Sequence, residues 1–98
     1  MPAYVINDME VLDPQGLEDY KKLSPQTVVQ YGGKFLARGG AIETVEGEWS
    51  PKRIVILEFP SVEQARAWVN SPEYAPARQL RQKASRSNII IVDGVPPA

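Results

Sequence analysis

The sequence predicts a single α+β domain over residues 1–98, of the ferredoxin-like βαββαβ type: a four-stranded antiparallel sheet with helices on one face. Three observations lead to this prediction. The chain of 98 residues has the size of one domain. Patterns for strand, helix, strand, strand, helix and strand follow one another with little sequence left over. Apolar residues occupy both faces of the last two strands, which indicates that something covers the helix-free face.

The first half of the chain reads as a strand followed by a helix. Residues 3–12 are rich in apolar residues and predict the strand. Asp-Pro at 13–14 predicts a helix start, because Asp caps free amides and Pro fits the first turn. Ser-Pro at 24–25 repeats this signal, so we expect a helix that is kinked or built as two pieces. Gly-Gly at 32–33 predicts its end, with one glycine in the left-handed conformation.

The second half reads as a hairpin, a helical region and a last strand. Residues 34–42 and 53–59 predict two antiparallel strands, joined by a connection that contains residues 46–51. Ser61 and Gln64 match a capping box at the start of the next helix. Ser-Pro at 71–72 predicts a further helical segment, which we expect to begin again near Ala75 because Pro76 would interrupt it. Residues 88–93 predict the last strand, and residues 94–98 a tail.

The composition excludes several classes of function. The 11 basic and 12 acidic residues give a net charge of −1, which provides no attraction to nucleic acid or to a membrane surface. The longest apolar runs have four residues, so no segment is expected to span a membrane. The first residues lack a basic segment followed by a long apolar one, so we expect no signal peptide. The absence of cysteine fits a reducing compartment, and we expect a cytoplasmic protein.

The chain also contains no histidine, which limits its chemistry. Histidine-based triads and histidine-ligated metal or haem sites are excluded. The spacing of Asp and Glu matches no calcium-binding loop. We therefore expect no metal, no haem and no other cofactor, and any acid or base must be Asp, Glu, Tyr or Lys.

Two segments resemble a known bacterial family. They are YGGKFLARGG at residues 31–40 and EGEWSPKRIVILEFPSVEQARAWVNSPEY at residues 46–74. The chain resembles, over residues 3–94, the uncharacterised family named domain of unknown function thirteen-thirty, although Pro76 departs from the helix-friendly residue expected there. The resemblance implies a dimeric α+β barrel. That superfamily includes antibiotic-biosynthesis monooxygenases, haem-degrading monooxygenases, muconolactone isomerase and chlorite dismutase, so it implies a fold but not a reaction.

Arg38 is the first candidate for a substrate-binding residue, because it lies on a strand between glycines. A guanidinium group binds a carboxylate or an enolate oxygen through two parallel hydrogen bonds. The alternative is a structural ion pair with Glu58 or Asp8 across the sheet, since a charge in the middle of a sheet needs a partner. We expect Arg38 to be partly buried and paired with Glu58, which lies on the neighbouring strand and is therefore a candidate for the substrate-binding site as well.

Four further residues are candidates for a substrate pocket. Trp68 and Tyr74 could form an aromatic wall, with the Tyr74 hydroxyl as donor, although an aromatic residue on an apolar helix face is more often core. Tyr20 faces the sheet from the first helix, and its hydroxyl needs a partner if buried. Asn7 lies within the first strand. The resemblance adds that cofactor-free monooxygenases of the superfamily use Asn, Trp and Tyr around a phenolic substrate, but no residue here can be assigned a catalytic role.

Three other features have mainly structural interpretations. The glycine pair at 39–40 predicts a bend or bulge, with room for a ligand as the alternative. Trp49, in the hairpin connection, is expected to be exposed or packed against a partner subunit. Basic residues near the end of the chain predict a solvated helix face; they are Arg78, Arg81, Lys83 and Arg86.

Three functional hypotheses remain. The first is a cofactor-independent enzyme acting on a small aromatic, enol or lactone substrate. The second is a non-catalytic dimeric module, which binds a small molecule or is associated with stress. The third is a scaffold whose pocket is filled by side chains. In each case we expect a homodimer formed through the helix-free sheet faces, since face-to-face packing of two sheets would bury their apolar residues.

Overall fold

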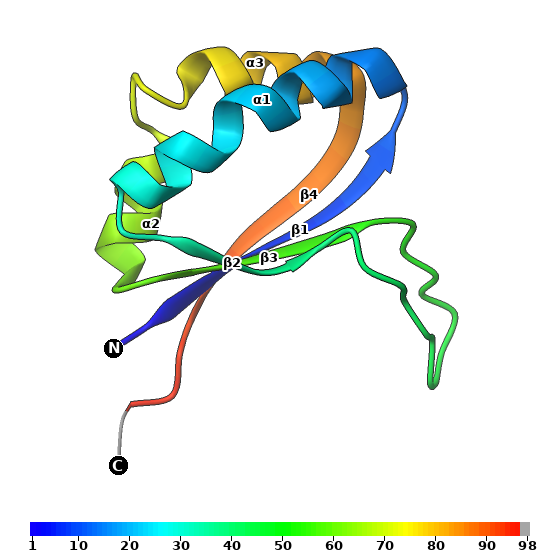
Figure 1. Cartoon of the computed structure of the whole chain (residues 1–98). Helices are drawn as coiled ribbons and strands as arrows, with labels where there is room; N and C mark the ends of the chain where they lie inside the picture. Colours follow the sequence, from blue (N-terminus) through cyan, green and yellow to red (C-terminus); the bar gives the residue numbers. More distant parts are fainter. Residues whose placement is uncertain (97–98) are drawn as a thin grey trace.

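Residues 1–96, which the computed structural model describes, form one four-stranded antiparallel sheet with helices on one face (Figure 1). The elements follow in the order β1 (Ala3–Val11), α1 (Pro14–Gln30), β2 (Lys34–Arg38), β3 (Ile54–Phe59), α2 (Val62–Val69), α3 (Ala75–Ala84) and β4 (Ser85–Asp93). In space the strands lie in the order β2-β3-β1-β4, and every neighbouring pair is antiparallel. The predicted ferredoxin-like fold is confirmed. No helix in residues 1–96 is long and apolar enough to cross a membrane.

Helix α1 begins and ends at the predicted signals. The Asp13 side chain accepts a hydrogen bond from the amide of Gln15 at 3.2 Å. At the other end Gly32 adopts φ +82°, and the Gly32 and Gly33 amides bond to the last free carbonyls of the helix at 3.0 and 2.9 Å. A single helix runs through Pro25, so the helix is not built as two pieces. Buried residues on both sides of Pro25 hold the two parts of the helix against the core.

The second helical region also follows its caps. The Ser61 side chain accepts a hydrogen bond from the amide of Gln64 at 3.1 Å, as the capping box predicts. Between α2 and α3, the Ser71 hydroxyl donates to the Trp68 carbonyl at 2.8 Å and accepts from the Tyr74 amide at 3.1 Å. This turn fixes Tyr74 directly before α3, which begins at Ala75 as expected.

Two strand boundaries differ from the sequence predictions by more than one residue. β4 begins at Ser85 instead of residue 88, because α3 ends at Ala84 and Ser85 already pairs with Val11. β2 ends at Arg38 instead of residue 42. Gly39 has φ +69° and turns the chain away from the sheet, so residues 39–53 form a long connection that extends from the body of the domain (Figure 1). The predicted tail at 94–98 ends outside the described residues.

The core lies between the sheet and the helices. One row of side chains crosses the covered face from β2 to β4, formed by Phe35, Leu57, Val5 and Ile91 in register. The buried side chains include Phe59, Trp68 and Tyr74, which pack on this row from β3 and the helical region. Burial of these large side chains provides the main stabilisation of the domain.

The opposite face of the sheet is apolar but carries no helix (Figure 1). Here Ile56, Ile6 and Ile90 lie next to one another on β3, β1 and β4. Ile90 is 54% exposed. In the connection Trp49 is 64% exposed, and its indole nitrogen donates to Asp8 Oδ2 at 3.0 Å. The side chains of this face are therefore available for contact with another molecule.

Candidate active site

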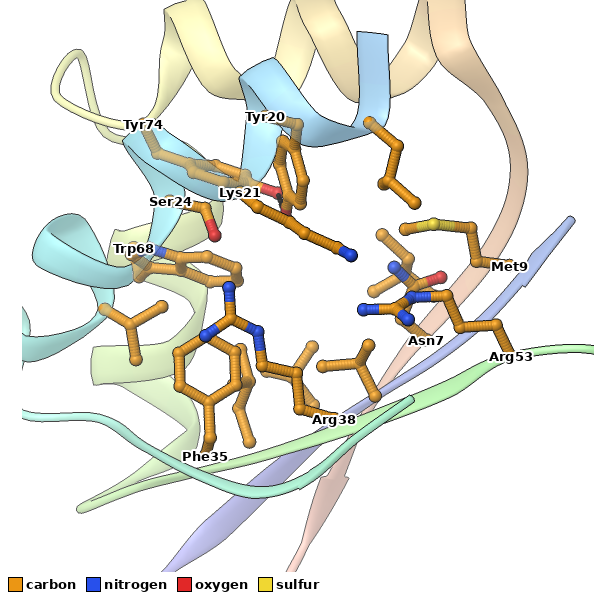
Figure 2. Close-up of a pocket in the computed structure, with 16 residues that line it drawn as sticks. Asn7, Met9, Tyr20, Lys21, Ser24, Phe35, Arg38, Arg53, Trp68 and Tyr74 are labelled. Atoms are coloured by element: carbon orange, nitrogen blue, oxygen red, sulfur yellow. Dashed lines mark hydrogen bonds between the residues drawn. The ribbon is translucent and has the colours of Figure 1, made fainter. Parts of the chain in front are cut away.

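A cavity lies between the covered face of the sheet and α1 (Figure 2). Apolar side chains from the sheet and α1 form most of its wall, and the following polar or aromatic side chains also line it: Asn7, Tyr20, Lys21, Ser24, Phe35, Arg38, Arg53, Trp68 and Tyr74. Its volume is about 30 Å³. Since one water needs roughly 10–15 Å³, the cavity has room for water but not for an aromatic ring unless side chains move.

Five of the six residues predicted to bind a substrate line this cavity. They are Asn7, Tyr20, Arg38, Trp68 and Tyr74. The sixth, Glu58, lies between the buried residues Leu57 and Phe59 on β3 and therefore faces the other side of the sheet. The fold thus gathers residues from β1, α1, β2, α2 and the turn before α3 around one space.

The predicted pairing of Arg38 with Glu58 is wrong, and so is the expected burial of Arg38. Glu58 instead forms an ion pair with Lys34, with Nζ and Oε2 3.1 Å apart. β2 has an irregular register between Phe35 and Ala37, and Arg38 pairs with Val55. This bulge brings Arg38 to the same face as Phe35, whose ring centre lies 4.6 Å from the guanidinium carbon. A bend or bulge was predicted at Gly39 and Gly40. The bend is found at Gly39, which has φ +69°, whereas the bulge lies between Phe35 and Ala37.

Three cationic side chains surround the cavity: Lys21, Arg38 and Arg53 (Figure 2). Lys21 pairs with Glu18 at 3.1 Å. Among the described residues, no carboxylate lies within ion-pair distance of Arg38 or Arg53. The Arg53 Nε and the Asn7 Oδ1 are buried and have no hydrogen-bond partner. A buried donor and a buried acceptor without partners are costly, so this side of the cavity is suited to a polar guest.

Lys21 and Arg53 line the cavity but were not predicted to do so. Lys21 follows Leu17 at the four-residue spacing of one helix face, and Leu17 lines the same cavity. Arg53 lies two positions before Val55, so strand alternation directs both toward the helices. Both signals were present, but a charged residue at such a position is more often solvated, and sequence alone gave no reason to prefer the inward side.

Trp68 forms part of the core and part of the cavity wall. Its ring centre lies 5.4 Å from that of Phe59 and 4.1 Å from that of Tyr74. Its indole nitrogen donates to Thr27 Oγ1 at 3.0 Å, which ties α2 to α1. Because its polar atom is already satisfied, Trp68 offers a ligand only its flat apolar surface.

A hydrogen-bonded chain connects the cavity with α3. The Tyr20 and Tyr74 hydroxyls lie 2.8 Å apart, and Arg81 Nε donates to the Tyr74 hydroxyl at 3.3 Å. Because Arg81 can only donate, Tyr74 is free to donate to Tyr20, and Tyr20 can donate into the cavity. Burial raises the pKa of Tyr20, and the nearby Tyr74 adds to this. Tyr20 is therefore a neutral donor at ordinary pH, suited to an anionic oxygen.

The prediction of a solvated basic helix face is wrong for Arg81. Arg81 is only 6% exposed, and it shares the buried side of α3 with Ala77 and Ala84. The small residues four positions before and three positions after it marked this face as buried. Its spacing from Arg78 was compatible with either side of the helix.

The cavity can stabilise negative charge but has no carboxylate base. None of its lining residues, all within the described part of the chain, is Asp or Glu. Residues 1–96 also contain no cluster of acidic side chains that could hold a metal ion. These residues suit a ligand that enters as an anion or that loses its proton to water.

The chain matches a family described as a domain of unknown function (DUF1330), over residues 2–95. It belongs to this family. No curated protein matches the chain. The family match confirms the resemblance read from the motifs, and it assigns no reaction.

Solved structures show the same fold at low identity. A protein of unknown function from Rhodopseudomonas palustris is 22% identical, with a TM-score of 0.76 over 98% of this chain and 84% of that chain. A dimeric ferredoxin-like protein of unknown function from Jannaschia is 10% identical, with a TM-score of 0.75 over 96% and 100%. SnoaB, a cofactor-independent oxygenase from Streptomyces nogalater, is 13% identical, with a TM-score of 0.65 over 98% and 95%. At these identities the likeness is one of fold.

Proposed function

We propose that the cavity binds a small flat organic anion, a carboxylate or an enolate attached to an aromatic or unsaturated ring. The observation that carries this proposal is the pair Arg38 and Arg53, which face one cavity without a carboxylate partner among the described residues. The unpartnered Arg53 Nε supplies a donor for the anion, and Trp68 supplies a flat apolar surface for the ring. Entry requires Arg38 to move, which its exposed position on β2 permits.

The proposed activity is that of a cofactor-independent enzyme that acts on such a ligand as its enolate or phenolate. The guanidinium groups and the Tyr20 hydroxyl would stabilise the negative oxygen, which is a role that needs no metal. The absence of a carboxylate from the lining fits a substrate that needs no strong base. The shared fold with SnoaB, a cofactor-independent oxygenase, is consistent with this proposal.

A second candidate is a non-catalytic binding module with the same ligand class. Among the described residues, the lining contains no Asp or Glu that could act as a general base, which favours this candidate. The small volume of about 30 Å³ favours neither candidate and instead supports the third hypothesis, a scaffold whose pocket is filled by side chains. The two candidates predict the same binding residues and differ in the fate of the ligand.

Calorimetric titration with salicylate, against its neutral analogue salicylamide, tests the binding proposal. We expect salicylate to bind and salicylamide to bind at least about tenfold more weakly, since the amide lacks the charge that pairs with arginine. Arg38→Gln and Arg53→Gln should each weaken salicylate binding by about tenfold or more. Arg66→Gln, an exposed arginine on α2 outside the cavity, is the matched control and should bind as the wild type does.

Equal affinity for salicylate and salicylamide in the wild type would contradict the proposal, as would an unchanged affinity in both cavity variants. Analysis of the recovered ligand then separates the two candidates. Conversion of bound enols or phenols, lost in Arg38→Gln, supports the enzyme. Recovery of every ligand unchanged supports the binding module.

We also propose that the protein is a homodimer, joined through the helix-free face of the sheet. The row Ile56, Ile6 and Ile90 supports this, because three adjacent β-branched side chains on one open face suit burial against a second sheet. Dimers are named among the structural neighbours from Jannaschia and Bacteroides fragilis.

A further inference from the structure

Arg81 is a buried cation with no anionic partner among the described residues. It is 6% exposed, and none of the ion pairs in residues 1–96 includes it. Its side chain makes one hydrogen bond, from Nε to the Tyr74 hydroxyl at 3.3 Å. A guanidinium group has five donors, so the donors on its two terminal nitrogens are not used by this bond. Removing a positive charge from water is costly unless an anion or several acceptors compensate it.

Arg81 lines a groove between α3 and β4. Arg78, Arg86, Ser85 and Ser87 line the same groove. Arg78 precedes Arg81 by three residues and therefore lies on the same side of α3. Arg86 pairs with Glu10 at the longer distance of 3.9 Å, and no Asp or Glu is among the residues that line the groove in the described chain. The groove thus gathers positive charge around a buried guanidinium.

Two serine hydroxyls add directional groups to this charge. Ser85 Oγ lies 3.0 Å from Ser87 Oγ and donates to the Arg81 carbonyl oxygen at 2.6 Å, so the hydroxyl pair lies beside the main chain of Arg81. Since Ser85 gives its only hydroxyl hydrogen to the carbonyl, Ser87 is the donor to Ser85, and it can turn that hydrogen toward a ligand in the groove instead. Apolar side chains also line the groove, from Val69, Ile89 and Ile91. Arg78 Nη1 lies among them and donates to the Val69 carbonyl oxygen at 3.4 Å.

We propose that this groove is a binding site for a phosphate group, held by Arg81 and Arg78 with a hydrogen bond from Ser87. A phosphate has several acceptor oxygens and up to two negative charges, so it can use two guanidinium groups and a hydroxyl at the same time. A carboxylate can also pair with two arginines, but it carries one negative charge and two acceptor oxygens, so a phosphate matches this set of donors better. The apolar side chains that line the groove beside Arg78 suit the organic part of a phosphate ester.

This site is separate from the proposed anion site in the cavity. Arg38 and Arg53 line the cavity and not the groove, whereas Arg78 lines the groove and not the cavity. The two proposals can therefore fail independently. They meet at Ile89, which lines both, and at Tyr74, which lines the cavity and accepts a hydrogen bond from Arg81.

Thermal unfolding and calorimetric titration with inorganic phosphate and with phenyl phosphate test the proposal, with sodium chloride at matched ionic strength as the reference. We expect both phosphates to raise the Tm of the wild type above that in chloride, since a ligand that binds the folded state stabilises it. Tighter binding of phenyl phosphate would identify the ligand as an ester, and equal binding would identify free phosphate.

Three variants test which residues carry the effect. Arg78→Gln should weaken phosphate binding by about tenfold. Lys83→Gln, on the same helix but outside the groove lining, is its charge-matched control and should respond as the wild type does. Ser87→Asp introduces a carboxylate beside Arg81, so it should raise the Tm in phosphate-free buffer and abolish the response to phosphate.

Arg81→Gln should also lose the response to phosphate. Because this buried substitution also affects folding, the test of the proposal rests on the other variants. A wild type that responds to phosphate no more than to chloride overturns the proposal. A response that is equal in Arg78→Gln, Ser87→Asp and wild type overturns it as well. Arg38→Gln should respond to phosphate as the wild type does, even though it should bind salicylate more weakly.

Discussion

The two faces of the sheet have nearly the same amino acids and very different surroundings. On the covered face Val5 lies between Leu57 and Ile91 and is 2% exposed. One position along β1, Ile6 lies between Ile56 and Ile90 on the helix-free face, where Ile90 is 54% exposed. Hydrophobicity therefore does not distinguish the faces. What distinguishes them is the helices, which follow β1 and β3 and pack on one side only.

Polar groups make the difference clearer. The row of the covered face next to Val5 contains Asn7 between Val55 and Ile89, with Arg38 beside Val55. On the helix-free face the charged side chains have partners within the domain, as the pair of Lys34 with Glu58 shows. Polar side chains without hydrogen-bond partners thus lie on the covered face, between the sheet and the helices. Exposed apolar side chains lie on the helix-free face. We interpret the first as a ligand site and the second as an association surface.

The largest expected contrast comes from truncating one buried side chain. Phe59→Ala removes a ring that is 1% exposed and contacts Trp68, so it should lower the free energy of unfolding by about 3–5 kcal/mol. Ile90→Ala on the helix-free face should cost the folded monomer less than about 1 kcal/mol. Urea unfolding at low protein concentration measures both. Similar losses in the two variants would mean that the two faces are equally buried in the isolated chain.

A charge in the isoleucine row tests the association surface directly. Ile6→Lys should convert the proposed dimer into a monomer and leave the far-ultraviolet circular dichroism unchanged, because a lysine there cannot be buried against a second sheet. Sedimentation velocity measures the mass. Ile6→Val keeps the apolar face and is the control. A wild-type protein that sediments as a monomer, or a variant that remains dimeric, contradicts the proposed interface.

The pH dependence of stability tests the burial of Tyr20, a polar side chain that packs against the covered face. The pKa of Tyr20 is raised from the ordinary value of 10.0, mainly by burial. Folding therefore favours the protonated phenol, so its contribution is complete below about pH 10 and is lost as the pH rises beyond it. Tyr20→Phe should flatten the loss of stability above pH 10. Urea titrations at several pH values measure the free energy of unfolding of both proteins. If it falls equally steeply above pH 10 in wild type and variant, Tyr20 ionises as freely in the folded state as in the unfolded state.

The smallest expected effect comes from a hydrogen bond that lies on neither face of the sheet, between Tyr31 and Glu73. The Tyr31 hydroxyl donates to Glu73 Oε1 at 2.7 Å, and this bond lowers the pKa of the Glu73 carboxyl below 4.5. A lowered folded pKa means a stabilisation that is present above the ordinary value and lost as the pH falls through the lowered one. Glu73→Gln should remove that acid dependence with little change at neutral pH. An acid titration of Tm that is unchanged in the variant contradicts this assignment.

The elements and their caps could be predicted from the sequence because their signals are local. Asp13, Ser61 and Gly32 each determine a helix end through bonds to residues at most four positions away. The end of β2 was missed since the turn at Gly39 and the bulge after Phe35 depend on pairing with β3. A bulge of one residue changes which side chains share a face, and sequence alternation alone cannot show where it occurs.

The candidate site was predicted in part for the same reason. Asn7, Trp68 and Tyr74 lie on elements whose buried side follows from their apolar neighbours. The partner of Arg38 was wrong because the bulge turns it away from Glu58. Arg81 was missed because helical spacing relates residues to one another but does not orient them toward the sheet.

The positions of the two tryptophans provide a separate optical signal for each side of the molecule. Trp68 is 3% exposed beside the cavity, whereas Trp49 is 64% exposed on the connection that extends from the sheet. Their indole emission should differ accordingly, with a blue-shifted spectrum for Trp68 and a spectrum close to that of free indole in water for Trp49. Trp49→Phe would leave one emitter that senses the cavity, and Trp68→Phe would leave one that an aqueous quencher such as iodide can reach until another protein surface covers it.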